Sequence, residues 1–440
     1  MPDRATSTDP AVQAQLDRLW SLSPGADLLG LERITALLAR LGNPERHLPP
    51  VFHVAGTNGK GSTCAFLRAS LEAAGYRVHA YTSPHLVRFN ERIRVAGRLI
   101  DDATLAPLLA EVLDQADGLH ASFFEVTTAA AFLHFTRVPA DACVIEVGLG
   151  GRLDATNVVA PVVTGIAALG IDHQAFLGDT LAEIAAEKAG IAKRGIPVVT
   201  MRYPPEIARV IAQAASQAGA TLHAAGADWH HESTDNRIEI SDADGTLTLP
   251  RPTLAGAHQA DNLALAAAML RHQHVLHVPA AAIATGATKA IWPARLQRRS
   301  EGPLVRRLPP ERRRFGVWLD GAHNEQAAAA IADRWTRGGP TALVIGMLAN
   351  KDADAVLRHL VATSGGCEVV AVPVPSHAHH TPDALAELSL QHGASQATTA
   401  ASVEAAFDRL ADDGGGCSVL IAGSLYLAGE VLVLNDEPPT

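Results

Sequence analysis

The stretch VFHVAGTNGKGSTCA, residues 51–65, predicts a strand, a glycine-rich loop and the start of a helix. Val51–Val54 form a short, mostly apolar run, and Thr63–Gly75 carry apolar residues at helical spacing. The loop between them would expose backbone N–H groups at a helix N-terminus, and Lys60 adds a positive charge. A loop of this kind binds polyphosphates, and the Ser62 hydroxyl would coordinate the accompanying magnesium ion.

The composition indicates a globular protein with two domains. The 440 residues exceed what one core usually fills, and 48% are hydrophobic while 19% are charged. A net charge of −10 argues against general nucleic-acid binding, so local groups must hold any anionic ligand. No apolar run reaches the ~18 residues of a membrane span, and the start of the chain lacks the apolar core of a signal peptide. The four cysteines form no CxxC pair and are expected to be reduced core thiols of a cytoplasmic protein: Cys64, Cys143, Cys367 and Cys417.

Three further polar residues follow predicted strands. Ser83 comes after the strand Arg77–Tyr81, Glu146 directly follows a buried strand, and His173 follows another. Open α/β sheets collect their ligands at the carboxyl ends of the strands. A carboxylate placed like Glu146 needs a cation, and a strand followed by an acid is a common magnesium-binding pattern. Taken singly, Ser83 also fits a turn and His173 a structural role.

These motifs together resemble the Mur ligase superfamily, and within it the folylpolyglutamate synthase and dihydrofolate synthase branch. The resemblance spans roughly residues 30 to 430. It is carried by GTNGKGS at 56–62, SPH at 83–85, EVGLGGRLDATN at 146–157, DH at 172–173, EKAGI at 187–191, DGAHN at 320–324, GMLANKD at 346–352 and GSLY at 423–426.

The resemblance implies a set of site residues. The magnesium ligands would be Ser62, Ser83, Glu146, His173 and a Lys188 carbamylated by CO2, serving two ions. ATP would contact Gly56, Thr57, Asn58, Gly59, Lys60, Gly61, Ser62, Asn262, Arg295, Asp320 and His323. The pterin or folate substrate would contact Ser122, Phe123, Phe124, Glu125, Leu153, Asp154 and Ala155, with Ser21 to Pro24 nearby. Lys60, Lys188, His173 and Arg295 would take part directly in catalysis. Alone, Lys188 would be read as a solvated helix residue.

We expect an α/β fold with two domains. Residues 1–297 would form a P-loop-type, mostly parallel sheet flanked by helices, carrying ATP and the pterin or folate substrate. Residues 298–440 would form a smaller Rossmann-like α/β domain for glutamate ligation. Residues 221–250 are expected to be an antiparallel β region. The stretch Arg295–Arg314, with eight arginines, is expected to be a solvated linker or hairpin at the domain junction.

The expected activity is ATP-dependent addition of L-glutamate to dihydropteroate, to folyl (poly)glutamates or to both, through an acyl phosphate. A monofunctional folylpolyglutamate synthase or another Mur-type amino-acid ligase is the alternative. A murein-precursor ligase is disfavoured because only 50 residues precede Val51, and a small-molecule kinase or a nucleotide switch would leave part of the motif set unused. The partners would be small molecules only, with no nucleic acid and no membrane, and the protein would be a monomer.

Overall fold

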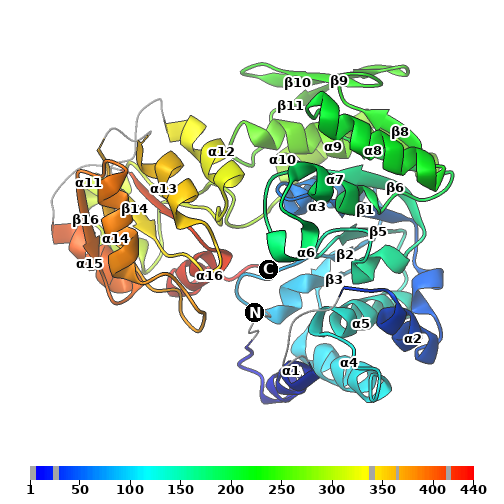
Figure 1. Cartoon of the computed structure of the whole chain (residues 1–440), viewed down its shortest axis with the longest axis horizontal. Helices are drawn as coiled ribbons and strands as arrows, with labels where there is room; N and C mark the ends of the chain where they lie inside the picture. Colours follow the sequence, from blue (N-terminus) through cyan, green and yellow to red (C-terminus); the bar gives the residue numbers. More distant parts are fainter. Residues whose placement is uncertain (1–5, 23–28, 336–341, 363–365, 413–417) are drawn as a thin grey trace. The chain divides into compact units, whose positions relative to one another are not determined.

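The protein divides into two compact units, shown in a computed structural model that describes residues 6–22, 29–335, 342–362, 366–412 and 418–440 (Figure 1). The first unit contains the residues up to Thr253, together with His258–Ile291 and Thr440. The second contains Leu254–Ala257 and Trp292–Pro439. Among the described residues, no helix is long and apolar enough to cross a membrane.

The described part of the first unit is built around an eight-stranded sheet in the order β4-β3-β2-β5-β1-β6-β7-β8. Along the sheet, the neighbouring strands β2, β5, β1, β6, β7 and β8 are parallel to one another. Strands β3 and β4 form an antiparallel extension beside β2. The bounds are β1 (Val51–Ala55), β2 (Val78–Tyr81), β3 (Ile93–Val95), β4 (Arg98–Leu99), β5 (Ala142–Glu146), β6 (Pro161–Ile166), β7 (Pro197–Thr200) and β8 (Thr221–Ala224).

Helices cover both faces of this sheet. Their bounds are α1 (Pro10–Leu22), α2 (Glu32–Arg40), α3 (Lys60–Ala73), α4 (Asp102–Gln115), α5 (Phe123–Arg137), α6 (Gln174–Leu177), α7 (Leu181–Ala189), α8 (Pro205–Ala218), α9 (His258–His272) and α10 (Ala280–Lys289), with 3-10 turns η1 (Pro44–His47), η2 (Phe89–Arg92) and η3 (Ala155–Val158). Helix α3 packs against both α9 and α10. Val51 and Ala55 point to the face covered by α4, α5, α7 and α8. Both faces of β1 are therefore buried.

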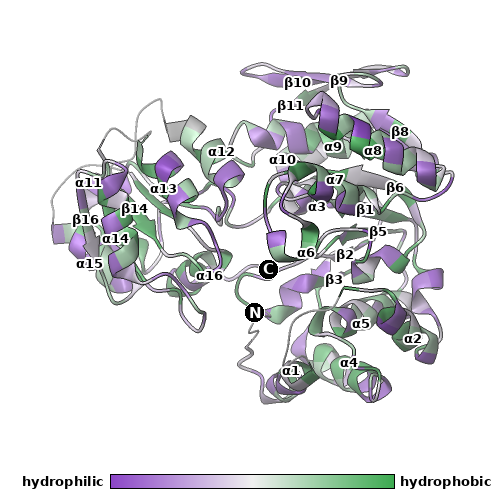
Figure 2. Ribbon diagram, in the orientation of Figure 1, coloured by the Kyte–Doolittle hydropathy of each residue, from purple (hydrophilic) through white to green (hydrophobic). Residues whose placement is uncertain are grey.

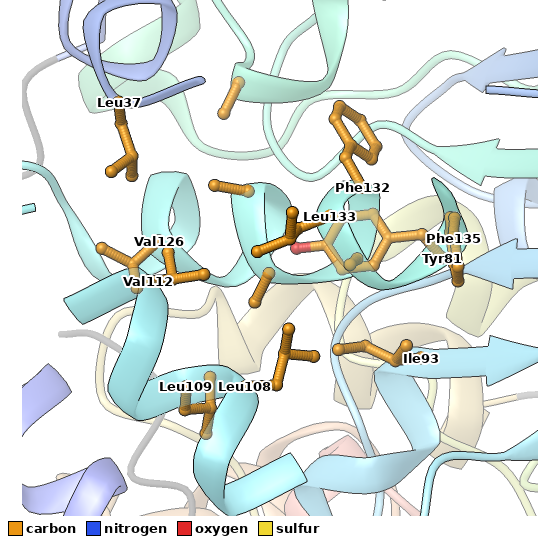
Figure 3. Packing of buried hydrophobic residues seen from close by; sticks show 14 of the residues in the cluster. Leu37, Tyr81, Ile93, Leu108, Leu109, Val112, Val126, Phe132, Leu133 and Phe135 are labelled. Carbon is orange, nitrogen blue, oxygen red and sulfur yellow. The ribbon is translucent and has the colours of Figure 1, made fainter. Parts of the chain in front are cut away.

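The core between α4, α5 and the sheet holds α5 in place. Figure 3 shows Leu108, Leu109 and Val112 of α4 lying near Val126 and Leu133 of α5. The Tyr81 hydroxyl also hydrogen-bonds the Thr128 hydroxyl over 3.1 Å, and its ring lies edge-on to Phe132. Burying a side chain of this size stabilises a fold by roughly 1.5–3 kcal/mol. Helix α5, whose first turn carries several of the predicted substrate residues, is thus anchored along its length.

A small antiparallel sheet lies beside α9 and α10 (green in Figure 1) and consists of β9 (His230–Ser233), β10 (Arg237–Asp242) and β11 (Gly245–Pro250). The expectation for residues 221–250 was right for these strands and wrong for Thr221–Ala224. That segment pairs in parallel with β7. It follows helix α8, and a strand reached through a helical crossover runs parallel to the strand before the helix.

The second unit contains, in its described residues, a six-stranded sheet in the order β12-β13-β17-β14-β15-β16. Its strands are β12 (Gln297–Arg299), β13 (Val317–Leu319), β14 (Ala342–Ile345), β15 (Glu368–Ala371), β16 (Gln396–Thr399) and β17 (Val419–Ala422). Its helices are η4 (Val305–Arg307), α11 (Pro310–Arg313), α12 (Glu325–Trp335), α13 (Ala353–Ala362), α14 (Pro382–Gln391), α15 (Val403–Asp412) and α16 (Leu425–Leu434). All neighbours are parallel except β12 with β13. The predicted α/β class and the two-sheet architecture are confirmed.

Amphipathic helices shield both sheets. Helix α8 buries Ile207, Ile211 and Ala215 and shows both hydrophobic and hydrophilic segments in Figure 2. In the second unit, α12, α13 and α14 contribute to one apolar cluster with β14 and β15. Loops follow the carboxyl ends of the central strands, and these loops contain most of the predicted site residues.

The arginine-rich stretch is part of the second unit's structure, so the expectation of a solvated linker was wrong. The alternative, a hairpin, is right in that β12 at the start of the stretch pairs antiparallel with β13, the next strand of the chain. Gln297–Arg299 form β12, and Pro310–Arg313 form α11. The Arg312 side chain is buried and lies 3.5 Å from a carboxylate oxygen of Glu368. Of the cysteines, Cys64, Cys143 and Cys367 are free and buried. Ser23, Pro24 and Cys417 lie outside the described residues.

Candidate active site

The glycine loop follows β1 at the centre of the first unit's sheet, between β5 and β6. Gly59 has φ 82° and caps α3, a conformation that favours glycine. A Cβ at Gly59 would overlap the side-chain amide of Asn262, which comes from the first turns of α9. The structure therefore brings Asn262 against the loop, as the ATP assignment requires.

Thr57 fastens the loop to the segment after β6. The backbone N–H groups of Thr57 and Asn58 both donate to the carbonyl of Ala168, at 2.8 and 3.1 Å. The Thr57 hydroxyl donates to the Gly170 carbonyl at 2.9 Å and accepts from the Gly170 N–H at 3.1 Å. Because these two amides are already used, a bound phosphate would rely on the N–H groups further along the loop and at the start of α3.

Glu146 ends β5 beside the loop. Its side chain is buried, Oε1 lies 4.0 Å from the Lys60 ammonium, and Oε2 accepts a hydrogen bond from the Ser83 N–H at 3.3 Å. The structure thus brings Glu146, Lys60 and the Ser83 backbone together at the carboxyl ends of β1, β2 and β5. A buried carboxylate next to a serine-bearing turn suits a divalent cation that takes its other ligands from phosphate and water.

The donor set fits magnesium better than a metal held wholly by the protein. In the described ranges, no group of three or more His, Cys, Asp and Glu side chains is arranged to hold a metal. Magnesium usually binds through one or two protein oxygens, with substrate phosphates and waters completing its octahedron. Ser62, in the first turn of α3, and Glu146 supply oxygens of this kind.

Lys188, on α7, is buried and reaches the base of the loop. Its Nζ donates to the Gly56 carbonyl at 2.9 Å. Burial, and secondly the positive charge of Lys60, lowers the pKa of Lys188 to about 7. A large fraction of this amine is therefore uncharged at neutral pH, whereas the amine of a solvent-exposed helix lysine would be charged. The reading of Lys188 as a solvated helix residue does not hold.

His173 lies on the segment that Thr57 fastens. It adopts φ 53° and precedes the short helix α6, and its backbone N–H donates to the Asp172 carboxylate at 2.8 Å. Its side chain is about half exposed, with Nε2 4.0 Å from Asp172. An exposed imidazole at the carboxyl end of β6, next to the loop strand, remains accessible to a ligand.

The predicted substrate residues of α5 are held by a capping box. The Ser122 hydroxyl accepts from the Glu125 N–H, and the Glu125 carboxylate accepts from the Ser122 N–H at 2.6 Å. The same carboxylate oxygen accepts from Arg33 Nε at 3.0 Å. Phe123 is buried, whereas Phe124 is only partly buried and lies against Gly148, where a Cβ would overlap its ring.

The segment 153–155 contacts the backbone just after Gly148. Asp154 is buried and caps η3, with Leu153 before it and Ala155 after it. Its carboxylate accepts from the N–H groups of Leu149 at 2.8 Å and Thr156 at 2.9 Å. Burial raises the pKa of Asp154, and these hydrogen bonds oppose the rise. The carboxylate therefore organises its own loop, whatever it contacts in addition.

Three predicted ATP residues meet within the second unit. Asp320 follows β13 and accepts from the N–H of Leu296 at 2.7 Å and of Ala322 at 2.8 Å. The Arg295 guanidinium lies against Gly321, where a Cβ would be 3.1 Å from Nη1. His323 Nδ1 lies 2.8 Å from the Gly321 carbonyl, so Nδ1 is the donor in the neutral ring.

Comparison with known proteins gives a family for this arrangement. A family model described as Mur ligase middle domain matches residues 54–270, and one described as Dihydrofolate synthetase, C-terminal domain matches residues 307–434. The dihydrofolate synthase/folylpolyglutamate synthase of Escherichia coli is 37% identical over 416 residues, covering 93% of this chain and 92% of that protein. The chain belongs to the dihydrofolate synthase/folylpolyglutamate synthase family. The resemblance inferred from its motifs is therefore confirmed.

Solved structures of the family have the same architecture. E. coli FolC in complex with DHPP and ADP is similar with a TM-score of 0.86 and 35% identity, covering 99% of each chain. A bifunctional folylpolyglutamate synthase/dihydrofolate synthase from Yersinia pestis, complexed with AMPPNP and Mn ion, gives 0.84 and 32%, covering 98% of this chain and 99% of that one. The similarity covers both units.

Some residues of this family member were missed by sequence reasoning. His53 and Thr156 form a buried hydrogen bond, and Arg33 pairs with Glu125. One feature of the sequence could have pointed to His53, because this polar residue interrupts the apolar strand VFHVA. No local feature of the sequence indicates the pairing of Arg33 with Glu125, since the two residues are 92 positions apart.

Proposed function

We propose that this protein is an ATP-dependent ligase that adds L-glutamate to dihydropteroate and to folyl (poly)glutamates through an acyl phosphate. The observation that carries the proposal is the meeting of Lys60 with Glu146, at 4.0 Å, on a glycine loop that follows the central strand. It joins a phosphate-binding group to a metal-binding group in a member of this ligase family.

The chemistry needs two successive displacements. A carboxylate oxygen of the acceptor attacks the γ-phosphorus of ATP, the bond from γ-phosphorus to the bridging oxygen breaks, and ADP leaves. The α-amino nitrogen of glutamate then attacks the acyl carbon, inorganic phosphate leaves, and the nitrogen loses its proton to give the amide. Positioning and charge neutralisation provide most of the rate enhancement in such transfers.

We assign the roles as follows. The N–H groups of Gly59, Gly61 and Ser62, with Lys60, hold the phosphates, while Gly56, Thr57 and Asn58 shape the loop and Asn262 borders it. Ser62, Ser83, Glu146, His173 and Lys188 would hold magnesium ions, which neutralise phosphate charge when bound. Arg295, Asp320 and His323, which come together within the second unit, are assigned to nucleotide binding. Ser122, Phe123, Phe124, Glu125, Leu153, Asp154 and Ala155 would line the pterin or folate site.

We further propose that Lys188 is carbamylated by CO2. Only an uncharged amine attacks CO2, and burial together with Lys60 brings the Lys188 pKa down to about 7. The product is an anion, which suits a position 2.9 Å from the loop carbonyl of Gly56 only if a cation lies beside it. A magnesium ion would supply that cation.

We also assign the pterin or folate site and the ATP-binding loop to a first domain, residues 1–297, and glutamate binding to a second domain, residues 298–440, which includes Asp320 and His323. Free, buried cysteines at the described positions Cys64, Cys143 and Cys367 are typical of a reducing compartment, so we place the enzyme in the cytoplasm. We propose that it acts as a monomer.

The decisive assay uses purified protein, ATP, magnesium and labelled L-glutamate, with dihydropteroate or a tetrahydrofolyl glutamate as acceptor. One labelled amide should form for each ADP and phosphate released with each acceptor. ADP formed with acceptor but without labelled amide would indicate a kinase. Amide formed only with the folyl acceptor would leave a monofunctional folylpolyglutamate synthase, and no amide with either would contradict the proposal.

A further inference from the structure

A buried chain of hydrogen bonds runs from the strand under the glycine loop to the predicted substrate segment. His53 Nε2 lies 2.9 Å from the Thr156 hydroxyl, and that hydroxyl donates to Asp154 Oδ1 at 2.5 Å. His53 and Thr156 are fully buried and Asp154 is 3% exposed. His53 is the middle residue of β1, which leads directly into the loop.

The direction of these bonds follows from the donors available. The Asp154 carboxylate accepts from the N–H groups of Leu149 and Thr156 and from the Thr156 hydroxyl, so it acts as an acceptor throughout. The single proton of the Thr156 hydroxyl is used in that bond. His53 must therefore donate from Nε2, and its Nδ1 is left without a proton.

The arrangement is not the one that stability alone would favour. Among the residues that the structure describes, His53 Nδ1 is buried and has no hydrogen-bond partner. An unpartnered polar atom in a core costs free energy, and an apolar side chain at the centre of a buried strand would avoid that cost. Burial, aided by the charge of Lys193, lowers the pKa of His53 to about 3, so the ring stays neutral.

The segment that this chain holds lies between two parts of the site. At one end, Gly148 touches the ring of Phe124. At the other end, a Cβ at Gly151 would be 2.8 Å from the carbonyl oxygens of Glu187 and Lys188, and the Arg152 N–H donates to the Glu187 carbonyl at 2.8 Å. Residues 148–157 therefore form a bridge from the proposed acceptor site to Lys188.

We propose that His53 is a positioning residue, which acts through Thr156 and Asp154 to fix residues 148–157 and thereby places the acceptor carboxylate for phosphorylation. The proposal rests on the proposed function. It concerns the acceptor side of the reaction, because the hydrogen bonds run from His53 through Thr156 to Asp154 and Leu149, in the predicted acceptor segment. Loss of the chain should thus weaken use of the acceptor more than use of ATP.

Thr156→Val tests this with little change in volume. We expect KM for the acceptor to rise roughly 10- to 100-fold, as when a supporting hydrogen bond behind a site is removed, with KM for ATP and affinity for ADP close to wild type. His53→Leu should behave alike, and the double variant should be no worse than the poorer single variant, because both break one chain. Thr156→Ser and His53→Gln keep the donors and should stay within about threefold of wild type.

Thr164→Val is the matched control. Thr164 is also fully buried, lies beside His53 on β6, and donates its hydroxyl to the Pro197 carbonyl instead. It should leave both KM values unchanged. An unchanged acceptor KM in Thr156→Val, an equal rise in both KM values, or a Thr156→Ser variant as impaired as Thr156→Val would each overturn the proposal.

A second measurement needs neither activity nor a substitution. NMR of the wild-type protein with ¹⁵N-labelled histidine should show His53 as the neutral Nε2–H tautomer, and it stays decisive even if Thr156→Val fails to fold. An Nδ1–H tautomer would reverse the bonds and overturn the proposal. Wild-type protein that forms no amide would instead contradict the proposed function, so the two failures are distinguishable.

Discussion

The Lys188 ammonium reaches from α7 to the glycine loop, where its Nζ lies 2.9 Å from the carbonyl oxygen of Gly56. This bond links Lys188, whose pKa is strongly lowered, to the base of the phosphate loop. Because Lys188 is buried and its pKa is about 7, the residue can exist as a free amine under physiological conditions.

Lys188→Ala should abolish turnover while the protein stays folded. The variant removes the proposed carbamate and, with it, a magnesium ligand, and we expect kcat to fall on the order of 10²–10³-fold or more. Steady-state kinetics and circular dichroism check both statements. Lys193→Ala is the matched control, since Lys193 donates to the Asn157 carbonyl at 2.8 Å but is not a proposed ligand. A Lys188→Ala enzyme with wild-type activity would remove the carbamate from the mechanism.

Lys188→Met should stabilise the protein in CO2-free buffer. The Lys188 pKa is lowered from its ordinary 10.5 to about 7, so between these values the unfolded state binds the extra proton. The wild-type free energy of unfolding therefore rises with pH through this window, and the full cost of the buried ammonium, a few kcal/mol, is present below it. Urea unfolding across the window should show the advantage of Lys188→Met shrinking as pH rises. An advantage independent of pH would contradict the linkage.

Glu146→Gln should lower kcat by roughly 10²–10³-fold with little effect on metal-free ADP binding. The substitution keeps the volume of a buried side chain but removes the charge that faces Lys60 at 4.0 Å. When activity is titrated with magnesium, the variant should need a higher magnesium concentration than the wild type for half-maximal activity. Asp141→Asn serves as control, because Asp141 precedes the same strand at its opposite end and accepts from the Arg77 N–H. Equal effects of the two substitutions would argue against a site at the carboxyl end of β5.

Gly59→Ala should destroy ADP binding, because it strains a residue at φ 82° and pushes into Asn262. Gly75→Ala isolates the first of these effects, since Gly75 has φ 92° and a Cβ there meets nothing within 4 Å. We expect Gly75→Ala to lower the free energy of unfolding by about 1–2 kcal/mol and to leave ADP binding unchanged. Calorimetric titration with ADP separates the two variants, and tight binding by Gly59→Ala would show that Asn262 does not border the loop as described.

Local patterns in the sequence were enough to predict most of the fold. The strand and the helix on either side of the glycine loop were predicted close to the bounds that the structure shows, Val51–Ala55 and Lys60–Ala73. Turn glycines and apolar periodicity carry that information within a few residues. The capping boxes at Ser122 and Thr180 are similarly local.

Pairings between distant segments were beyond sequence reasoning. The parallel partner of Thr221–Ala224 depends on where α8 delivers the chain, and the buried Arg312 depends on Glu368. A run of arginines looks solvated because the sequence does not show which one meets a carboxylate. The same limit hid Arg33 beside Glu125 and Thr156 beside His53.

Two hydrogen bonds between the Thr57 hydroxyl and the backbone of Gly170 couple the glycine loop to the segment that follows β6. Phe176, a few residues further on, is 41% exposed. A fluorophore attached there would lie in solvent, on a segment that is hydrogen-bonded to the loop. The protein thus offers a ready position for an optical reporter of nucleotide exchange.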